Sequence, residues 1–374
     1  MQRFPKAVIK KQIELISIIG AKIEKRYKEL GGASYFGALE RDDRNIRYYK
    51  EGCLYYSASD RVVYFVHGDI YKRWRQLGGM SWGAPSSDEH RTGDQRGWYS
   101  HFKNNSLTII CGPTGTYFVA NAIRAKYASM GWESSYLGYP ASDEMPFQDG
   151  GYVSAFQNGA IYWWQDTGAI DMQQIEVHYV GFKCYVETND QPWSPKKTAD
   201  EPYAVFGVIH PLGNSTLRTK VYDDVDSGEA RPDDIILYQG MPNGLVIHTT
   251  LMENDNGDPN KIKAKVQTAV QRMHEAGTVA LGFIPVVGPG VAAVAGPVVQ
   301  LLVAPTAGFI TDFFGLGDDL VGVQPLTLSA KHLIQLSSSA TQPDLGVFMP
   351  VNVRSQPFTG QGANYVLYFW VKKR

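Results

Sequence analysis

The sequence has few cysteines and no excess of charge of either sign. Its 374 residues include only three cysteines, and 36 basic against 37 acidic side chains leave a net charge of −1. Cys53, Cys111 and Cys184 form no CxxC pair, which excludes a zinc or dithiol motif and predicts three buried thiols. The alternative is a single disulfide between Cys53 and Cys111, the pair expected in one domain. The balanced charge gives no global reason to bind polyanions, so we expect no nucleic-acid partner.

The sequence motifs of common enzymes are also missing. The chain has no GxSxG elbow, Walker loop, HExxH pair or GxGxxG before a helix, and its eight histidines lack the spacing of metal ligands. We therefore predict a protein that is not an enzyme. Residues 1–20 mix lysines with apolar residues and lead to no small-residue cleavage site, so they do not resemble a signal peptide.

Aromatic residues and glycine, by contrast, are abundant. The chain has 22 Tyr, 16 Phe, 8 Trp and 38 Gly, which is typical of short strands joined by tight turns. A length of 374 residues predicts two or three domains, and the composition changes after residue 172. We therefore predict an α+β protein with one domain at residues 1–172 and another at residues 173–374.

One motif occurs three times in the first domain, in repeats at about residues 18–65, 66–118 and 119–171. Each copy has an apolar, a basic and an aromatic residue before a glycine, then a Gly/Pro turn, then an aromatic-rich hairpin pattern. The glycine suits a helix cap, and the turn and hairpin residues suit two short strands. One such unit cannot bury its apolar face alone, so we predict an array of three stacked helix–turn–hairpin units.

The turn of the third copy carries the most specific sequence. It contains Leu137-Gly138-Tyr139-Pro140 followed by Ser-Asp-Glu. This region resembles the LGFP repeat, named for a Leu-Gly-Phe-Pro turn. The resemblance implies a non-catalytic module that attaches to cell-wall polysaccharide in secreted, envelope-associated proteins. It therefore implies an extracellular or cell-envelope location, reached without a recognisable signal peptide in this chain.

The acidic pairs of the turns, Asp88-Glu89 and Asp143-Glu144, have two interpretations. Paired carboxylates can perform acid–base catalysis. Their recurrence in successive repeats favours a structural role in the turn, because catalysis needs one site and not several.

Exposed aromatic residues are the candidate carbohydrate-binding groups. Rings present flat apolar faces to the C–H faces of sugars, and we assign this role to Trp82, Trp132, Trp164 and Tyr139. The alternative is a place in the repeat core, which is common for large aromatic residues.

The second domain contains alternating apolar and polar segments separated by Gly, Pro, Asn and Asp. These segments predict an antiparallel β-sandwich, with strands at residues 173–187, 203–209, 217–222, 235–238, 245–253, 326–335 and 364–371. A helical and apolar insertion is predicted at residues 258–316, where Asp258 and Pro259 supply an N-cap and a first-turn proline.

Acidic residues cluster in the loops of this domain. Asp224, Asp226 and Asp255 are the best candidate metal ligands, and calcium is the candidate cofactor because it binds several oxygen ligands. Solvated turns, which also favour Asp and Asn, are the alternative.

Residues 276–311 contain no Asp, Glu, Lys or Arg. Four prolines divide this stretch, so we expect buried helices. The alternatives are a conditional membrane-inserting hairpin and a constitutive transmembrane anchor. The predicted function is a surface protein whose repeats dock on cell-wall polysaccharide, where the second domain acts. The alternative is a toxin-like effector whose apolar segment enters a target membrane.

Overall fold

The computed structural model describes residues 6–188, 199–255, 257–278, 282–286, 294–298, 319–341 and 350–374. It is a mixed α/β fold of mostly antiparallel sheets with few helices. The described residues divide into two compact units. The first comprises those up to residue 171 except 147–150, and the second comprises 147–150 and those from residue 172 onward.

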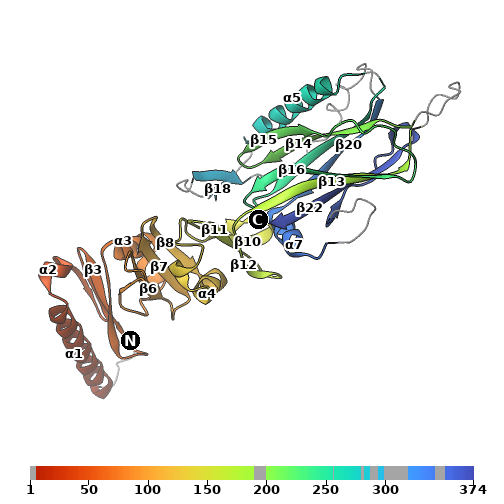
Figure 1. Cartoon of the computed structure of the whole chain (residues 1–374). Helices are drawn as coiled ribbons and strands as arrows, with labels where there is room; N and C mark the ends of the chain where they lie inside the picture. The colour runs from red at the N-terminus through yellow and green to blue at the C-terminus, as the bar shows by residue number, and fades with distance from the viewer. Residues whose placement is uncertain are drawn as a thin grey trace. The chain divides into compact units, whose positions relative to one another are not determined.

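The first unit consists of three successive segments, each with a helix followed by a four-stranded sheet (Figure 1). The first repeat contains α1 (Lys6–Glu29), α2 (Ala33–Phe36), β1 (Leu39–Asp43), β2 (Ile46–Tyr49), β3 (Gly52–Ser57) and β4 (Val62–His67). The second contains α3 (Gly68–Leu77), η1 (Gly79–Ser81), β5 (His90–Arg91), β6 (Trp98–Phe102), β7 (Leu107–Gly112) and β8 (Gly115–Ala120). The third contains α4 (Asn121–Ser129), η2 (Trp132–Ser134), β9 (Met145–Phe147), β10 (Gly151–Phe156), β11 (Gly159–Trp164) and β12 (Gly168–Met172). Between β9 and β10 the chain forms η3 (Gln148–Gly150), which belongs to the second unit.

Four strands replace the two-stranded hairpin that the motif predicted. The sheet edges hold the extra strands, and in β1 the sequence signal for a strand is weak. All five residues of β1 are exposed, and its sequence LERDD has no apolar alternation. Such an edge strand is recognised only from its partner, because periodicity reports burial on one face.

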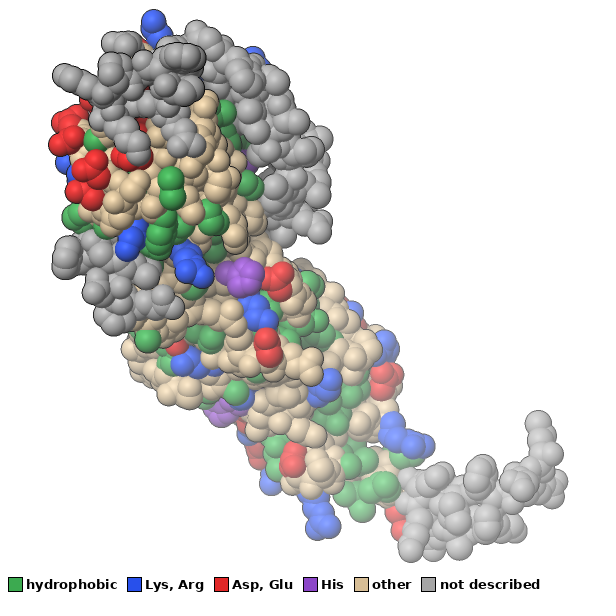
Figure 2. All heavy atoms as spheres, turned by 90° about the vertical axis from the view of Figure 1, so that its right-hand side faces the viewer, with side chains coloured by type: hydrophobic (Ala, Val, Ile, Leu, Met, Phe, Trp, Pro, Cys, Tyr) green, Lys and Arg blue, Asp and Glu red, His purple; other side chains and the backbone are tan. Residues whose placement is uncertain are grey.

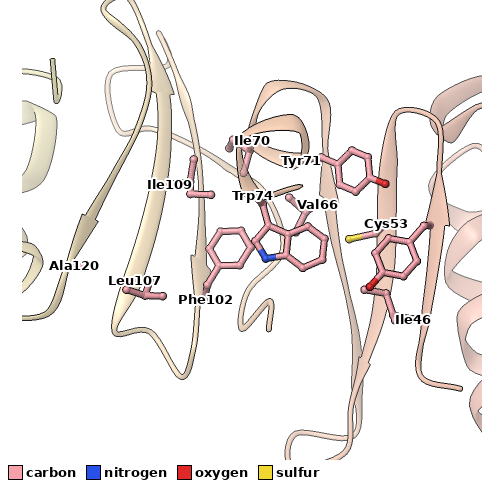
Figure 3. Packing of buried hydrophobic residues seen from close by; sticks show 11 residues of the cluster. Ile46, Cys53, Val66, Ile70, Tyr71, Trp74, Phe102, Leu107, Ile109 and Ala120 are labelled. Carbon is pink, nitrogen blue, oxygen red and sulfur yellow. The ribbon is translucent and has the colours of Figure 1, made fainter. Parts of the chain in front are cut away.

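Neighbouring repeats share a hydrophobic core around Trp74 of α3 (Figure 3). The indole is fully buried and stacks with Tyr48 of the first repeat and Phe102 of the second, at ring-centroid distances of 6.3 and 6.2 Å. Its Nε1–H donates to the Gly83 carbonyl at 2.8 Å. Since one ring fills the space between two sheets, each repeat depends on its neighbour for burial.

The acidic pair of the second repeat binds the edge of the first sheet. Strand β4 is an outer strand, and two of its outward N–H groups have no partner strand. The Phe65 and His67 N–H groups donate to Asp88 Oδ1 at 3.0 Å and Glu89 Oε2 at 3.1 Å. The two carboxylates therefore satisfy alternate donors of an otherwise open strand edge.

The third repeat repeats this arrangement, which we call the acidic clasp. The Phe118 and Ala120 N–H groups of β8 donate to Asp143 Oδ1 at 3.0 Å and Glu144 Oε2 at 3.1 Å. The predicted structural role of these pairs is thus realised between repeats and not within one turn.

Two further groups complete each clasp. The helix of the preceding repeat supplies an arginine to the aspartate, through Arg26 to Asp88 at 2.7 Å and through Arg73 to Asp143. The serine before each acidic pair binds its own sheet. Ser87 Oγ accepts from the His101 N–H, and Ser142 Oγ accepts from the Ala155 N–H, both at 2.9 Å. The Ser-Asp-Glu tripeptide therefore joins two sheets.

In the third repeat, Asp171 takes the place of the next clasp. Lys126 of α4 contacts Asp171 Oδ1 at 2.8 Å, and the Tyr136 hydroxyl donates to Asp171 Oδ2 at 2.6 Å. Burial opposes ionisation, but these two partners hold the pKa of Asp171 below its usual value. The array thus ends on a carboxylate supplied by its own last strand.

The second unit contains two four-stranded sheets, ordered β16-β13-β22-β21 and β15-β14-β17-β20. Tyr179 of the first sheet contacts Phe206 of the second at a centroid distance of 4.8 Å, and Phe206 also meets Phe369 at 6.2 Å. The bounds are β13 (Ile175–Val186), β14 (Pro202–His210), β15 (Gly213–Arg218), β16 (Ala230–Gly240), β17 (Leu245–Glu253), α5 (Pro259–Thr278), β18 (Gly282–Val286), β19 (Val294–Val298), β20 (Asp319–Leu328), α7 (Ala330–Ser338), β21 (Val353–Arg354), η4 (Gly360–Gly362) and β22 (Asn364–Lys373).

Helix α5, which lies in the predicted helical insertion, packs on β14. Ile262, Val266 and Val270 are buried against this strand. A Cβ atom on Gly207 would come within 2.2 Å of Val270, so only glycine permits this close approach. Asp258 accepts a hydrogen bond from the Asn260 N–H at 3.0 Å, which confirms its capping role.

Two predictions for the second unit are wrong. Residues 330–335 form α7 and not a strand, because Ala330, Leu333 and Ile334 are buried at helical spacing and Ser329 caps the helix. In the apolar stretch, residues 276–278 end helix α5, and the other described parts are the antiparallel strands β18 and β19 and not helices. Each contains a glycine and a proline, which disfavour a helix interior. The rest of residues 279–316 lies outside the described residues.

The structure also bears on the predicted membrane segment and on the cysteines. No helix among the described residues is long and apolar enough to cross a membrane. Cys53 and Cys184 are buried, Cys111 is half-buried, and all three are free thiols.

Removing one clasp carboxylate will destabilise the repeats. In Asp143→Ala the Phe118 N–H and Arg73 lose their partner, so we expect a loss of about 1–3 kcal/mol in the free energy of unfolding. Urea unfolding measures it. The control is Asp43→Ala, which breaks an exposed ion pair with Arg41 and will cost less than about 1 kcal/mol. Equal losses in the two variants would contradict the clasp.

The clasp glutamates will make stability fall with rising pH. Burial raises the pKa of Glu89 to about 7, although the His67 N–H bond works in the opposite direction. A raised folded-state pKa gives stability that is complete below the unfolded pKa and is lost as pH rises through 7. Relative to Glu89→Gln, the natural protein will lose up to about 1.4 kcal/mol per pH unit between pH 5 and 7.

Urea unfolding of both proteins at pH 5, 6, 7 and 8 measures this difference. Glu40→Gln is the control, because Glu40 is half-exposed and lies 3.8 Å from its partner Arg75. A difference between natural protein and Glu89→Gln that does not change with pH would show that the carboxyl is not buried in the folded state.

Candidate functional site

A pocket of about 300 Å³ lies between the second and third repeats. Three parts of the chain line it: the β5 strand and its following loop, the face of β6 and β7, and the turn after α4. Its lining residues are Arg91, Thr92, Gly93, Tyr99, His101, Ile110, Gly131, Trp132, Glu133 and Ser134. Aromatic rings with a few converging polar groups are typical of small-ligand and saccharide pockets.

Trp132 occupies a strained position in this pocket. It has φ of +56°, the left-handed region that bulky residues rarely adopt. The equivalent positions after the helices of the other two repeats hold Gly32 and Gly79, with φ of +59° and +58°. The same backbone turn therefore occurs three times, and only the third repeat places a side chain on it. Strain of this kind is found at functional sites more often than elsewhere.

Neighbouring side chains hold the indole of Trp132 half-buried. Tyr127 meets it edge-on at a centroid distance of 5.3 Å, His101 lies 6.0 Å away, and the Arg124 guanidinium lies 5.2 Å from the ring centre. The cation and the ring attract each other. The indole is thus fixed in orientation while it remains part of the pocket wall.

His101 is a neutral hydrogen-bonding group in this pocket. Burial, with the nearby charges of Arg124 and His90, lowers its pKa to about 4. Arg124 Nε donates to Thr108 Oγ1 at 2.7 Å, and Thr108 Oγ1 lies 2.9 Å from His101 Nδ1. The buried Thr108 hydroxyl has no other acceptor among the described residues, so it donates to Nδ1. The proton of the ring is therefore on Nε2.

The third repeat also shapes the loop that forms the rim of the pocket. Glu133 Oε1 accepts from the Gly93 N–H at 2.6 Å. The Tyr139 hydroxyl donates to Asp94 Oδ1 at 2.5 Å and lies 2.9 Å from Thr92 Oγ1. Its ring leaves no room for a Cβ on Gly112, because that atom would lie within 2.2 Å of it. The Leu-Gly-Tyr-Pro turn therefore binds the preceding repeat, through the hydrogen bonds and ring packing of Tyr139.

Of the four predicted carbohydrate-binding residues, only Trp132 lines the pocket. Tyr139 and Trp164 are 2% and 1% exposed, so their rings are packed inside the repeats. Trp82 is half-buried against Phe102 and Phe118. Counted back from the acidic clasp, it takes the place that the buried Leu137 has in the third repeat.

The predicted calcium ligands do not form a metal-binding group among the described residues. No cluster of three His, Cys, Asp or Glu side chains with metal-binding geometry occurs there. Asp224 accepts a bond from Arg231 through its backbone carbonyl at 2.8 Å, and the Asp226 N–H donates to Glu229. Figure 2 shows acidic side chains gathered at one end of the second unit. Residue 256, in the loop of Asp255, lies outside the described residues, and calcium stays a prediction.

Sequence reasoning missed His101, Tyr99 and the polar rim of the pocket. The signal was present in the aligned turns, where Gly31-Gly32 and Gly78-Gly79 correspond to Gly131-Trp132. A tryptophan in place of a repeated glycine indicates a side chain kept against a conformational cost.

Comparison with known families agrees with this geometry. Residues 83–135 and 137–175 match the family model of the LGFP repeat. These two segments are similar to the LGFP repeat. Each match begins near the turn, and the first runs on through the next helix, so the family unit is offset from the helix-first repeats described above. Together the matches cover about a quarter of the chain and leave out the first repeat. No relative was found among curated proteins.

Two substitutions of Trp132 will isolate the cost of its left-handed backbone conformation, because both remove the indole ring. Both Trp132→Gly and Trp132→Ala remove the indole, but alanine keeps the cost of a positive φ. We therefore expect the glycine variant to be more stable by about 1 kcal/mol, measured by urea unfolding. An alanine variant as stable as the glycine variant would contradict the left-handed conformation at this position.

Proposed function

We propose that this protein is a non-catalytic binding protein that attaches to cell-surface polysaccharide through the pocket of Trp132. LGFP repeats occur in surface and cell-wall associated proteins. The observation that carries the proposal is the tryptophan held in a left-handed turn where the other repeats have glycine. A ring kept at that conformational cost favours a role in recognition, because glycine suffices for the fold.

The chemistry of the pocket supports a saccharide ligand. Trp132 and Tyr99 offer aromatic faces to apolar C–H groups of a sugar ring. The Nε2–H of His101 and the Arg91 guanidinium are donors, and Glu133 is an acceptor, for sugar hydroxyls. All of these groups lie within residues 83–135, the first of the two segments that match the family.

Sedimentation with insoluble cell-wall polysaccharide tests this function. We expect the natural protein to cosediment and Trp132→Gly to bind at least about tenfold more weakly, since losing a ring contact of about 1.4 kcal/mol has that effect. The glycine variant retains a residue that the other repeats use at this position. Tyr152→Ala, which removes a 40% exposed ring outside the pocket lining, is the matched control and will bind normally.

Two results would overturn the proposal. One is failure of the natural protein to cosediment with any wall polysaccharide. The other is equal binding by the natural protein and Trp132→Gly.

A further inference from the structure

Helix α1 of the first repeat has two kinds of apolar residue. Ile19 and Ile23 are 5% and 1% exposed and pack in the core of the first repeat. Leu15 and Ile18 are each 54% exposed, among the most exposed large apolar side chains of the described residues. The second pair contributes nothing to the core of the repeat.

The exposed pair lies on a stripe bounded by lysines. At 100° per residue, Lys11, Leu15, Ile18 and Lys22 fall within a sector of about 60° along one side of α1. Apolar groups between long cationic side chains are typical of helices that lie in a membrane interface. There the lysine chains can extend so that their ammonium groups reach the lipid headgroups.

The charge of the helix indicates the partner. Helix α1 contains seven basic and three acidic residues, a net charge of +4. Arg26 binds Asp88, and Lys25 and Lys28 each lie near a glutamate of the same helix. The Lys22 ammonium donates to the Arg61 carbonyl at 3.2 Å and has no carboxylate partner among the described residues.

We propose that this stripe of α1 docks on an anionic lipid surface. A second copy of the chain would bring two helices of charge +4 together, which costs electrostatic energy, whereas anionic headgroups neutralise them. The interaction is peripheral, because two apolar side chains bury little area, and it weakens with salt. It is independent of the Trp132 pocket, since its residues belong to the first repeat.

Vesicle cosedimentation of the full chain tests the proposal. We expect binding to phosphatidylglycerol–phosphatidylcholine vesicles at low salt and little binding to pure phosphatidylcholine. The double variant Leu15→Glu/Ile18→Glu will bind the anionic vesicles at least tenfold more weakly. Leu39→Glu is the matched control, because Leu39 is a 53% exposed leucine of the same repeat that lies in β1.

A charge variant covers the case in which the double variant is misfolded. Lys11→Glu/Lys22→Glu leaves the apolar pair intact and will also lose binding to anionic vesicles. Three results would overturn the proposal: no binding by the natural protein, equal binding to neutral and anionic vesicles, or unchanged binding by both double variants. Self-association of the natural protein that either double variant abolishes would assign the stripe to a second copy. Trp132→Gly will bind vesicles normally, so loss of polysaccharide binding and loss of vesicle binding are distinguishable.

Discussion

The first unit depends on satisfying the open edge of each repeat's sheet. An outer strand presents backbone N–H groups that need partners, and a row of small sheets multiplies the problem. Here two adjacent carboxylates from the next repeat accept from alternate residues of the outer strand, and an arginine from the preceding helix neutralises one of them. Between the first and second repeats, the clasp of Asp88 and Glu89 acts together with the shared core around Trp74. The hydrogen bonds set how the two repeats are oriented, and the core buries their apolar faces.

The pocket exists because the clasp fixes the third repeat against the second. Once the third repeat is fixed to the edge of β8, its helix turn lies beside the sheet of the second repeat. Glu133 and Tyr139 then hold the loop from Thr92 to Gly97, and Trp132 closes the remaining space against His101. The walls of this pocket are therefore held in place by the same contacts that join the two repeats.

The sequence predicted the repeats well because their signals are local. A glycine after a helix and a Ser-Asp-Glu after a turn recur at nearly fixed spacing, so the units were visible without their partners. It did not show which aromatic rings face outward. Like Trp132, the other three candidate rings lie in aromatic-rich stretches with frequent glycines. Tyr139 is buried against the preceding repeat, whereas Trp82 packs on Phe102 and Phe118 of its own repeat. Trp164 is also buried, at 1% exposed. These contacts join residues distant in the sequence, so its local pattern does not reveal them. In the second unit, residues 330–335 fit a strand and a helix equally well until the capping Ser329 and the partner strands are known.

Asp171 affects where the array could accommodate an additional repeat. Tandem repeats gain and lose units through recombination between similar segments. A copy of the third repeat added behind itself would bring a second aspartate to Lys126, which already binds Asp171, and two carboxylates would compete for one cation. A copy of the second repeat inserted ahead of the third meets an arginine on one side and an acidic pair on the other. These ion pairs therefore favour an additional repeat between the second and third repeats over one placed behind the third.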